Sequence, residues 1–141
     1  MHSINQISTP STEEQKFEIA NTFLTAMRGN DWSLMRTLMA EDVVWTLPGT
    51  SLLSGPAKGV DPVINRAQSL KKFGVMFQLQ HILYGMEGVT LSLHNTASRE
   101  DLILDEYVAI IFLLEEGKIS SITTMLSDVE GINNFFVPGI I

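Results

Sequence analysis

Apolar residues recur at helical spacing along the first half of the chain, which predicts three helices. Ser11 and Glu14 have the spacing of a capping box, so the first helix is expected to begin after Ser11 and to end at residues 28–29. Asp31 is placed to cap a second, shorter helix. Asp61 and Pro62 suit the cap and first position of a third helix, which ends at residues 71–74. The apolar residues at helical spacing are Phe17, Ala20, Phe23, Leu24 and Met27 in the first helix; Leu34, Met35, Leu38 and Met39 in the second; and Val63, Ala67 and Leu70 in the third.

Alternation with period two replaces the helical pattern in the second half of the chain. After one short strand at residues 43–47, four strands are predicted at residues 76–84, 89–97, 102–114 and 119–126. The breaks between these four are short enough for antiparallel hairpins. Helices gathered ahead of a strand meander indicate an α+β fold, with an antiparallel sheet backed by helices on one face. Residues 1–10 show no periodicity and are expected to form a mobile arm ahead of a single domain at residues 11–141.

Composition and charge narrow the functional class. With 141 residues and 45% hydrophobic content, the chain can form one core but not two ordinary domains. The longest apolar run, residues 108–114, is too short to span a bilayer, so no membrane partner is expected and the predicted location is cytoplasmic. The chain has no cysteine. A net charge of −7 disfavours a nucleic-acid partner, because a basic patch would have to overcome the general repulsion.

The order of elements, with WTLPGTSLLSGPAKG at residues 45–59 and LLEEGKISSI at residues 113–122, resembles the nuclear transport factor 2-like superfamily. Within it, the chain is similar to SnoaL-like, polyketide-cyclase-related domains over residues 11–136. The resemblance implies a curved sheet wrapped by helices into a cone that holds a small hydrophobic or polycyclic ligand. It also implies a homodimer, and acid-base isomerisation, cyclisation or hydration without a cofactor. The alternative is a non-catalytic binding or accessory module, because fold analogy does not choose between them.

The pattern of the ketosteroid isomerases in this superfamily is not matched. Their base on the first strand falls on Leu47, their tyrosine on the first helix falls on Phe23, and their protonated acid on the penultimate strand falls on Ala109. None of these three side chains can take a proton or stabilise an oxyanion. The chain is therefore not expected to be a ketosteroid isomerase of the usual mechanism.

A different polar set follows from the same overlay. If Ala109 points into the cone, Asp105 and Tyr107 also do, since side chains alternate along a strand. A two-residue turn at residues 99–100 would place His94 opposite Asp105, so His94, Asp105 and Tyr107 are the predicted catalytic residues. The alternative is a purely structural His94–Asp105 pair at the solvent end of a hairpin. The other face, with Glu106, Val108, Ile110 and Phe112, is then the predicted dimer surface, unless the helices cover it.

The remaining predicted ligand-binding residues come from several elements. Trp45 is expected either to stack on a flat ligand or to be a core aromatic residue. Asp128 could contact the ligand as a base, although capping a short terminal helix is the preferred interpretation. Three scattered histidines suggest no metal site. The full predicted ligand-binding set is Phe23, Trp45, Leu47, Ala109, Thr124, Leu126 and Asp128.

Overall fold

The computed structural model describes residues 11–139, which form four helices and six strands. The predicted arm at residues 1–10 lies outside the described residues. No helix within residues 11–139 is long and apolar enough to cross a membrane. In chain order, the elements are α1 (Glu13–Gly29), α2 (Trp32–Thr37), β1 (Met39–Leu47), β2 (Gly55–Lys58), α3 (Val60–Lys72), β3 (Met76–Tyr84), β4 (Gly88–Arg99), β5 (Leu102–Glu115), β6 (Lys118–Leu126) and α4 (Val129–Phe135).

The three predicted helices are present, but two of them begin at different residues than expected. The capping box of α1 is formed one position later, by Thr12 and Gln15: the Thr12 hydroxyl accepts from the Gln15 amide at 3.1 Å, and the Gln15 side chain accepts from the Thr12 amide at 2.8 Å. Asp31 caps α2 as predicted. Gly59, and not Asp61, precedes α3, so Asp61 lies in the first turn, where a carboxylate favours the helix dipole.

The strands form one curved sheet in the order β2-β1-β6-β5-β4-β3. Strands β1 and β6 run parallel, whereas the other neighbours are antiparallel, so the sheet is mixed and the prediction of a wholly antiparallel sheet is wrong at this pair. Strand β2 lies between the predicted strand at residues 43–47 and the third helix, where no element was predicted, and it pairs with the end of β1. The α+β class and the curved sheet with helices against it are confirmed.

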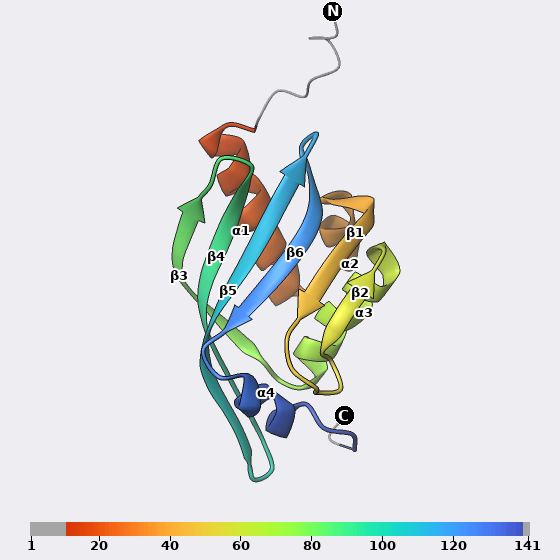
Figure 1. Cartoon of the computed structure of the whole chain (residues 1–141), viewed down its shortest axis with the longest axis vertical. Helices are drawn as coiled ribbons and strands as arrows, with labels where there is room; N and C mark the ends of the chain where they lie inside the picture. The colour runs from red at the N-terminus through yellow and green to blue at the C-terminus, as the bar shows by residue number, and fades with distance from the viewer. Residues whose placement is uncertain (1–10, 140–141) are drawn as a thin grey trace, which may run out of the picture.

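Helices α1, α2 and α3 lie on one face of the sheet, behind it in the view of Figure 1, and the opposite face is turned toward the viewer. On β5, the even-numbered residues from Leu104 to Leu114 are buried, while Asp105 and Tyr107 are exposed. The predicted orientation of this strand is therefore wrong. The even-numbered stripe is apolar except for Glu106, so turning it toward the helices removes more apolar surface from water. We call the opposite face of the sheet, which carries the odd-numbered residues of β5, the outer face.

The β4–β5 hairpin turns one residue later than predicted. Arg99 pairs with Leu102, and the turn is formed by Glu100 and Asp101, with Glu100 in the left-handed region at a φ of 55°. This moves the strand register by two positions, so that His94 lies opposite Tyr107 instead of Asp105. Because side chains alternate between the two faces of a strand, a register shift of two residues keeps each side chain on the same face of the hairpin.

Gly88, the first residue of β4, supports this hairpin because it leaves room for the backbone of β5. A Cβ atom at this position would lie 2.1 Å from the Phe112 carbonyl oxygen. We expect Gly88→Ala to lower the free energy of unfolding by about 2 kcal/mol in urea denaturation, because the two paired backbones must separate. Gly29→Ala, where nothing lies within 4 Å of the added atom, is the control and should be neutral or stabilising. Equal stabilities of the two variants would contradict this packing.

Candidate functional site

A small internal pocket lies between the sheet and the end of the molecule that carries α4. Its volume is about 30 Å³, which is room for roughly one or two water molecules. Most of its wall is apolar, and the polar residues on the wall are Asn95, Glu106 and Thr124. The indole ring of Trp45 forms part of the wall, and the apolar lining residues are Leu47, Leu70, Val75, Leu104, Val108, Ile110, Leu126, Ile132 and Phe136.

Glu106 is the residue in this pocket with the most unusual environment. Only 3% of its surface is exposed, and neither carboxyl oxygen has a hydrogen-bond partner. Burial, together with the negative charge of Asp128, raises the pKa of Glu106 from 4.5 to about 7. A carboxyl group with a pKa close to neutral exists in both protonation states under physiological conditions, so it can either donate or accept a proton.

The position of Asp128 follows from the way β6 ends. Ser127 and Tyr107 exchange two hydrogen bonds, from the Ser127 amide to the Tyr107 carbonyl at 2.9 Å and from the Tyr107 amide to the Ser127 hydroxyl at 2.8 Å. These bonds continue the β5–β6 pairing by one residue and hold Asp128 in the region of Glu106. Asp128 itself accepts a hydrogen bond from the Gly131 amide at 2.9 Å and caps α4, as the preferred interpretation of the sequence had it.

Asn95 lies directly opposite Glu106 in the β4–β5 register. It is 8% exposed, and its side-chain oxygen also has no partner. Within residues 11–139, this oxygen and the two carboxyl oxygens of Glu106 are the buried side-chain polar atoms without a hydrogen bond. Because buried polar groups are nearly always paired, three unpaired acceptors on one wall make this part of the pocket the candidate site.

Trp45 forms the opposite part of the pocket wall and is held there from two sides. Its indole nitrogen donates to the Thr124 hydroxyl at 2.7 Å. The Arg66 guanidinium lies 5.5 Å from the centre of the ring and donates to the carbonyl oxygens of Trp45 at 2.6 Å and Gly55 at 2.8 Å. These contacts fix the orientation of the indole ring, so the flat wall of the pocket is already formed.

The segment after β6 closes the mouth of the pocket. Ile132 in α4 and Phe136 just after it both line the cavity. The loop between β1 and β2 is tied to the same segment, since the Thr50 amide donates to the Asn133 side chain at 2.8 Å and the Leu52 amide donates to the Phe136 carbonyl at 3.0 Å. Pockets that enclose organic ligands usually measure several hundred Å³, so a ligand must displace part of this closure.

The predicted catalytic residues His94, Asp105 and Tyr107 are close to one another, but they lie on the outer face. His94 Nε2 and Asp105 Oδ1 are 2.6 Å apart, and the His94 and Tyr107 rings stack at 4.8 Å. The Asp105 side chain is 66% exposed and Tyr107 is 56% exposed. The expectation that this set lines the cone is therefore wrong, because its orientation was taken from the placement of Ala109.

Four of the seven predicted ligand-binding residues line the pocket: Trp45, Leu47, Thr124 and Leu126. Asp128 caps α4 and is not among the lining residues. Ala109 is on the outer face, and Phe23 lies behind the pocket wall, where its ring packs 4.7 Å from Phe112 and 6.3 Å from Trp45. Ligand binding by any of these residues remains a prediction.

Sequence reasoning missed Glu106 and Asn95 as site residues. A signal for Glu106 exists in the sequence, because it is the one carboxylate in the alternating stripe from Leu104 to Leu114. That stripe was interpreted as a dimer surface. Ala109, which was assigned the place of the isomerase acid, points outward, and the acidic residue of β5 that faces the pocket is Glu106.

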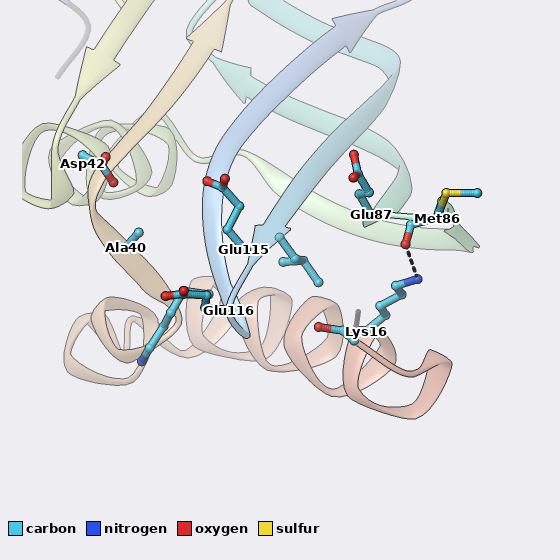
Figure 2. Close-up of a pocket in the computed structure, with 10 residues that line it drawn as sticks. Lys16, Ala40, Asp42, Met86, Glu87, Glu115 and Glu116 are labelled. Atoms are coloured by element: carbon cyan, nitrogen blue, oxygen red, sulfur yellow. Dashed lines mark hydrogen bonds between the residues drawn. The ribbon is translucent and has the colours of Figure 1, made fainter. Parts of the chain in front are cut away.

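A larger hollow of about 700 Å³ lies near the β3–β4 and β5–β6 turns, and we call it the basal groove (Figure 2). Its acidic residues are Asp42, Glu87, Glu115 and Glu116. Lys16 from α1 is committed to the backbone here, because its ammonium group donates to the carbonyls of Gly85 at 2.6 Å and Met86 at 3.1 Å. Within residues 11–139, the basal groove has no buried, unpaired polar group like Glu106. It is therefore a weaker candidate site than the internal pocket.

No model of a protein family matches the sequence, and no curated protein matches it either. Solved structures do resemble the chain. Bal32a from a soil-derived mobile gene cassette has a TM-score of 0.81 and 24% identity, over 87% of this chain and 97% of that chain. A nuclear transport factor 2-like protein from Burkholderia xenovorans has a TM-score of 0.78 and 18% identity, over 89% and 98% of the two chains. An LEH-like epoxide hydrolase from M. tuberculosis has a TM-score of 0.68 and 15% identity, over 87% and 90%.

At these identities the likeness concerns the fold alone. The chain has the nuclear transport factor 2-like fold, which confirms the predicted resemblance at that level. The solved structures that resemble the chain include proteins named as a ketosteroid isomerase, an epoxide hydrolase and a polyketide cyclase, and they do not assign one of these activities to this chain.

Proposed function

We propose that this protein binds a small, mostly apolar molecule in the internal pocket and that Glu106 exchanges a proton with it. The observation that carries the proposal is the buried, unpartnered carboxyl group of Glu106, with a pKa of about 7, on an otherwise apolar wall. Burying such a group costs stability, which a folded domain tolerates most readily where function requires it. In its enzymatic form, the proposal is an isomerase, cyclase or hydratase that uses acid-base catalysis without a cofactor.

The second candidate is a non-catalytic binding module that uses the same pocket. The absence of a second titratable group among the residues that line the pocket favours it, since Glu106 would have to act as both acid and base. In favour of the enzyme, one carboxyl group with a pKa near neutrality suffices for the simplest reaction, which takes a proton from carbon and returns it to the neighbouring position.

Cyclohexanone separates these two candidates. In H2O we expect it to shift the indole N–H signal of Trp45 in NMR spectra. In D2O we expect it to exchange its α-protons for deuterium at least about tenfold faster with the wild-type protein than with Glu106→Gln. Leu126→Trp should block binding by filling the pocket, whereas Thr46→Trp, at an exposed position on β1, should not. Binding without faster exchange supports the binding module. If no pocket signal shifts, the proposed function is wrong.

We also propose that two copies of the chain pair through the outer face. Exposed apolar side chains gather there, and such a surface is costly to leave in water. They include Met76, Ile103, Tyr107, Leu113 and Met125. The originally predicted dimer stripe of Val108, Ile110 and Phe112 is buried against the helices and is not available.

A charge on the outer face should separate the two copies. We expect the wild-type protein to sediment as a dimer at micromolar concentration, and Met125→Glu to weaken the dimer at least about tenfold, because a carboxylate would be buried against the partner. Met86→Glu introduces the same charge in the exposed β3–β4 turn and should leave the dimer intact. A wild-type monomer at that concentration would rule this interface out.

A further inference from the structure

When Glu106 is ionised, the unpaired atoms in the pocket are all hydrogen-bond acceptors. They are the two carboxyl oxygens of Glu106 and the side-chain oxygen of Asn95, which come from directly opposite positions on β5 and β4. Both residues are more than nine-tenths buried. With Glu106 ionised, these unpaired atoms offer no donor, so a ligand that supplies donors satisfies them better than one that supplies only acceptors, such as a carboxylate or an ether.

A second carboxylate acts electrostatically on Glu106. It is the side chain of Asp128, at the start of α4. The charged residue on α3 next to the pocket wall is Arg66, but its guanidinium is bonded to the carbonyls of Trp45 and Gly55 and does not neutralise Glu106. A cation placed between Glu106 and Asn95 would therefore offset the repulsion between the two carboxylates.

We propose that the ligand of this pocket carries a protonated amine on a compact apolar body. Its ammonium group would donate hydrogen bonds to Glu106 and Asn95, and its apolar part would lie along Val108 and Leu126 toward the Trp45 ring. An ammonium group has three donors for three unpaired acceptors, whereas an alcohol has one. This inference rests on the proposed function in one respect, because both place the ligand in the same pocket.

An ammonium group also suits the proton exchange proposed for Glu106. Each carboxyl oxygen has two lone pairs, so it can accept a hydrogen bond from the ammonium group and still take a proton. A neighbouring positive charge stabilises the carboxylate form, which is the form that accepts a proton. The ligand would thus prepare Glu106 to act as a base.

Three compounds with the same cyclohexyl ring test the ligand class: cyclohexylamine, cyclohexanol and cyclohexanecarboxylate. Their dissociation constants are measured at pH 7.5 from the NMR shifts of the Trp45 indole and the Glu106 and Asn95 amides. We expect cyclohexylamine to bind at least about tenfold more tightly than cyclohexanol, because a charge-assisted hydrogen bond is added. Cyclohexanecarboxylate should bind more weakly than cyclohexanol, because like charges repel.

Glu106→Gln should reduce the preference for the amine over the alcohol to about twofold or less and retain cyclohexanol binding. Glu87→Gln, which removes an exposed carboxylate in the β3–β4 turn, is the matched control and should keep the full preference. A second measurement needs no variant. At pH 7, calorimetry in phosphate and in Tris buffer should show release of about half a proton when cyclohexylamine binds, because Glu106 is about half protonated in the free protein.

Several results would overturn the inference. Equal binding of cyclohexanol and cyclohexylamine refutes the amine class and leaves the proposed pocket standing. A preference for the amine that survives in Glu106→Gln, or amine binding without proton release, places the amine on other carboxylates. If none of the three compounds shifts the pocket signals, both this inference and the proposed function fail.

Discussion

We expect Glu106→Gln to have a higher free energy of unfolding than the wild-type protein. The difference should grow by about 3 kcal/mol between pH 4 and pH 8. The reason is the pKa of Glu106, which burial and Asp128 raise from 4.5 in the unfolded chain to about 7 in the folded protein. Glutamine at the same position is neutral at every pH, so it does not carry the cost of a buried charge.

The sign of this effect follows from the protons bound in each state. Between pH 4.5 and pH 7, the folded protein keeps the Glu106 proton while the unfolded chain loses it. The free energy of unfolding of the wild-type protein therefore falls as the pH rises through this interval, and it levels off above pH 7. Below pH 4.5 both states are protonated, and the wild type and the variant should have similar stability.

Urea denaturation at four or five pH values measures this difference. Glu115→Gln, which replaces an exposed carboxylate at the end of the same strand, is the control and should alter stability by less than about 0.5 kcal/mol. If the difference between Glu106→Gln and the wild type stays constant from pH 4 to pH 8, the carboxyl group is not buried as described.

Arg66→Ala is expected to lower the free energy of unfolding by about 3 kcal/mol. The substitution leaves the carbonyl oxygens of Trp45 and Gly55 without their donors, and the first of these bonds is buried. It also removes the guanidinium from the Trp45 ring. Burial lowers the pKa of Arg66, yet the group remains charged at neutral pH, so the lost bonds are charge-assisted.

Arg36→Ala is the matched control for Arg66→Ala. Arg36 bonds to Asp61 at 2.7 Å, but both side chains are largely exposed, at 52% and 81%. Exposed ion pairs contribute little, so this variant should lose less than about 1 kcal/mol. Trp45 fluorescence in a Trp32→Phe background provides a second readout, because only Arg66→Ala should change the environment of the indole ring. Similar losses in both variants would contradict the role given to Arg66.

The order of helices and strands could be predicted from the sequence because apolar spacing differs between the two. The topology could not be predicted completely, since the parallel pairing of β1 with β6 joins segments far apart in the chain. Strand β2 has four residues, too few to show a periodic pattern. The capping box also had two candidates with the same spacing, and the structure uses Thr12 with Gln15 instead of Ser11 with Glu14.

The site was less predictable because it depends on which face of β5 is buried. Assigning Ala109 to the pocket reversed every side chain of the strand, and with it the roles of Asp105 and Glu106. His94 and Asp105 are still in contact, because the two-residue register shift keeps both side chains on the same face of the hairpin, where they are diagonal neighbours instead of directly opposite. Comparing the apolar content of the two stripes would have given the correct orientation.

The central claim is that Glu106 is a buried, unpaired carboxyl group in the pocket, and its own titration tests this most directly. The side-chain carboxyl carbon of Glu106 can be followed by NMR in uniformly labelled protein and assigned from the signal that Glu106→Gln removes. A midpoint at a pH of about 7 is the predicted result. A midpoint near the ordinary value of 4.5 would show that Glu106 is solvated or paired, and would contradict the account.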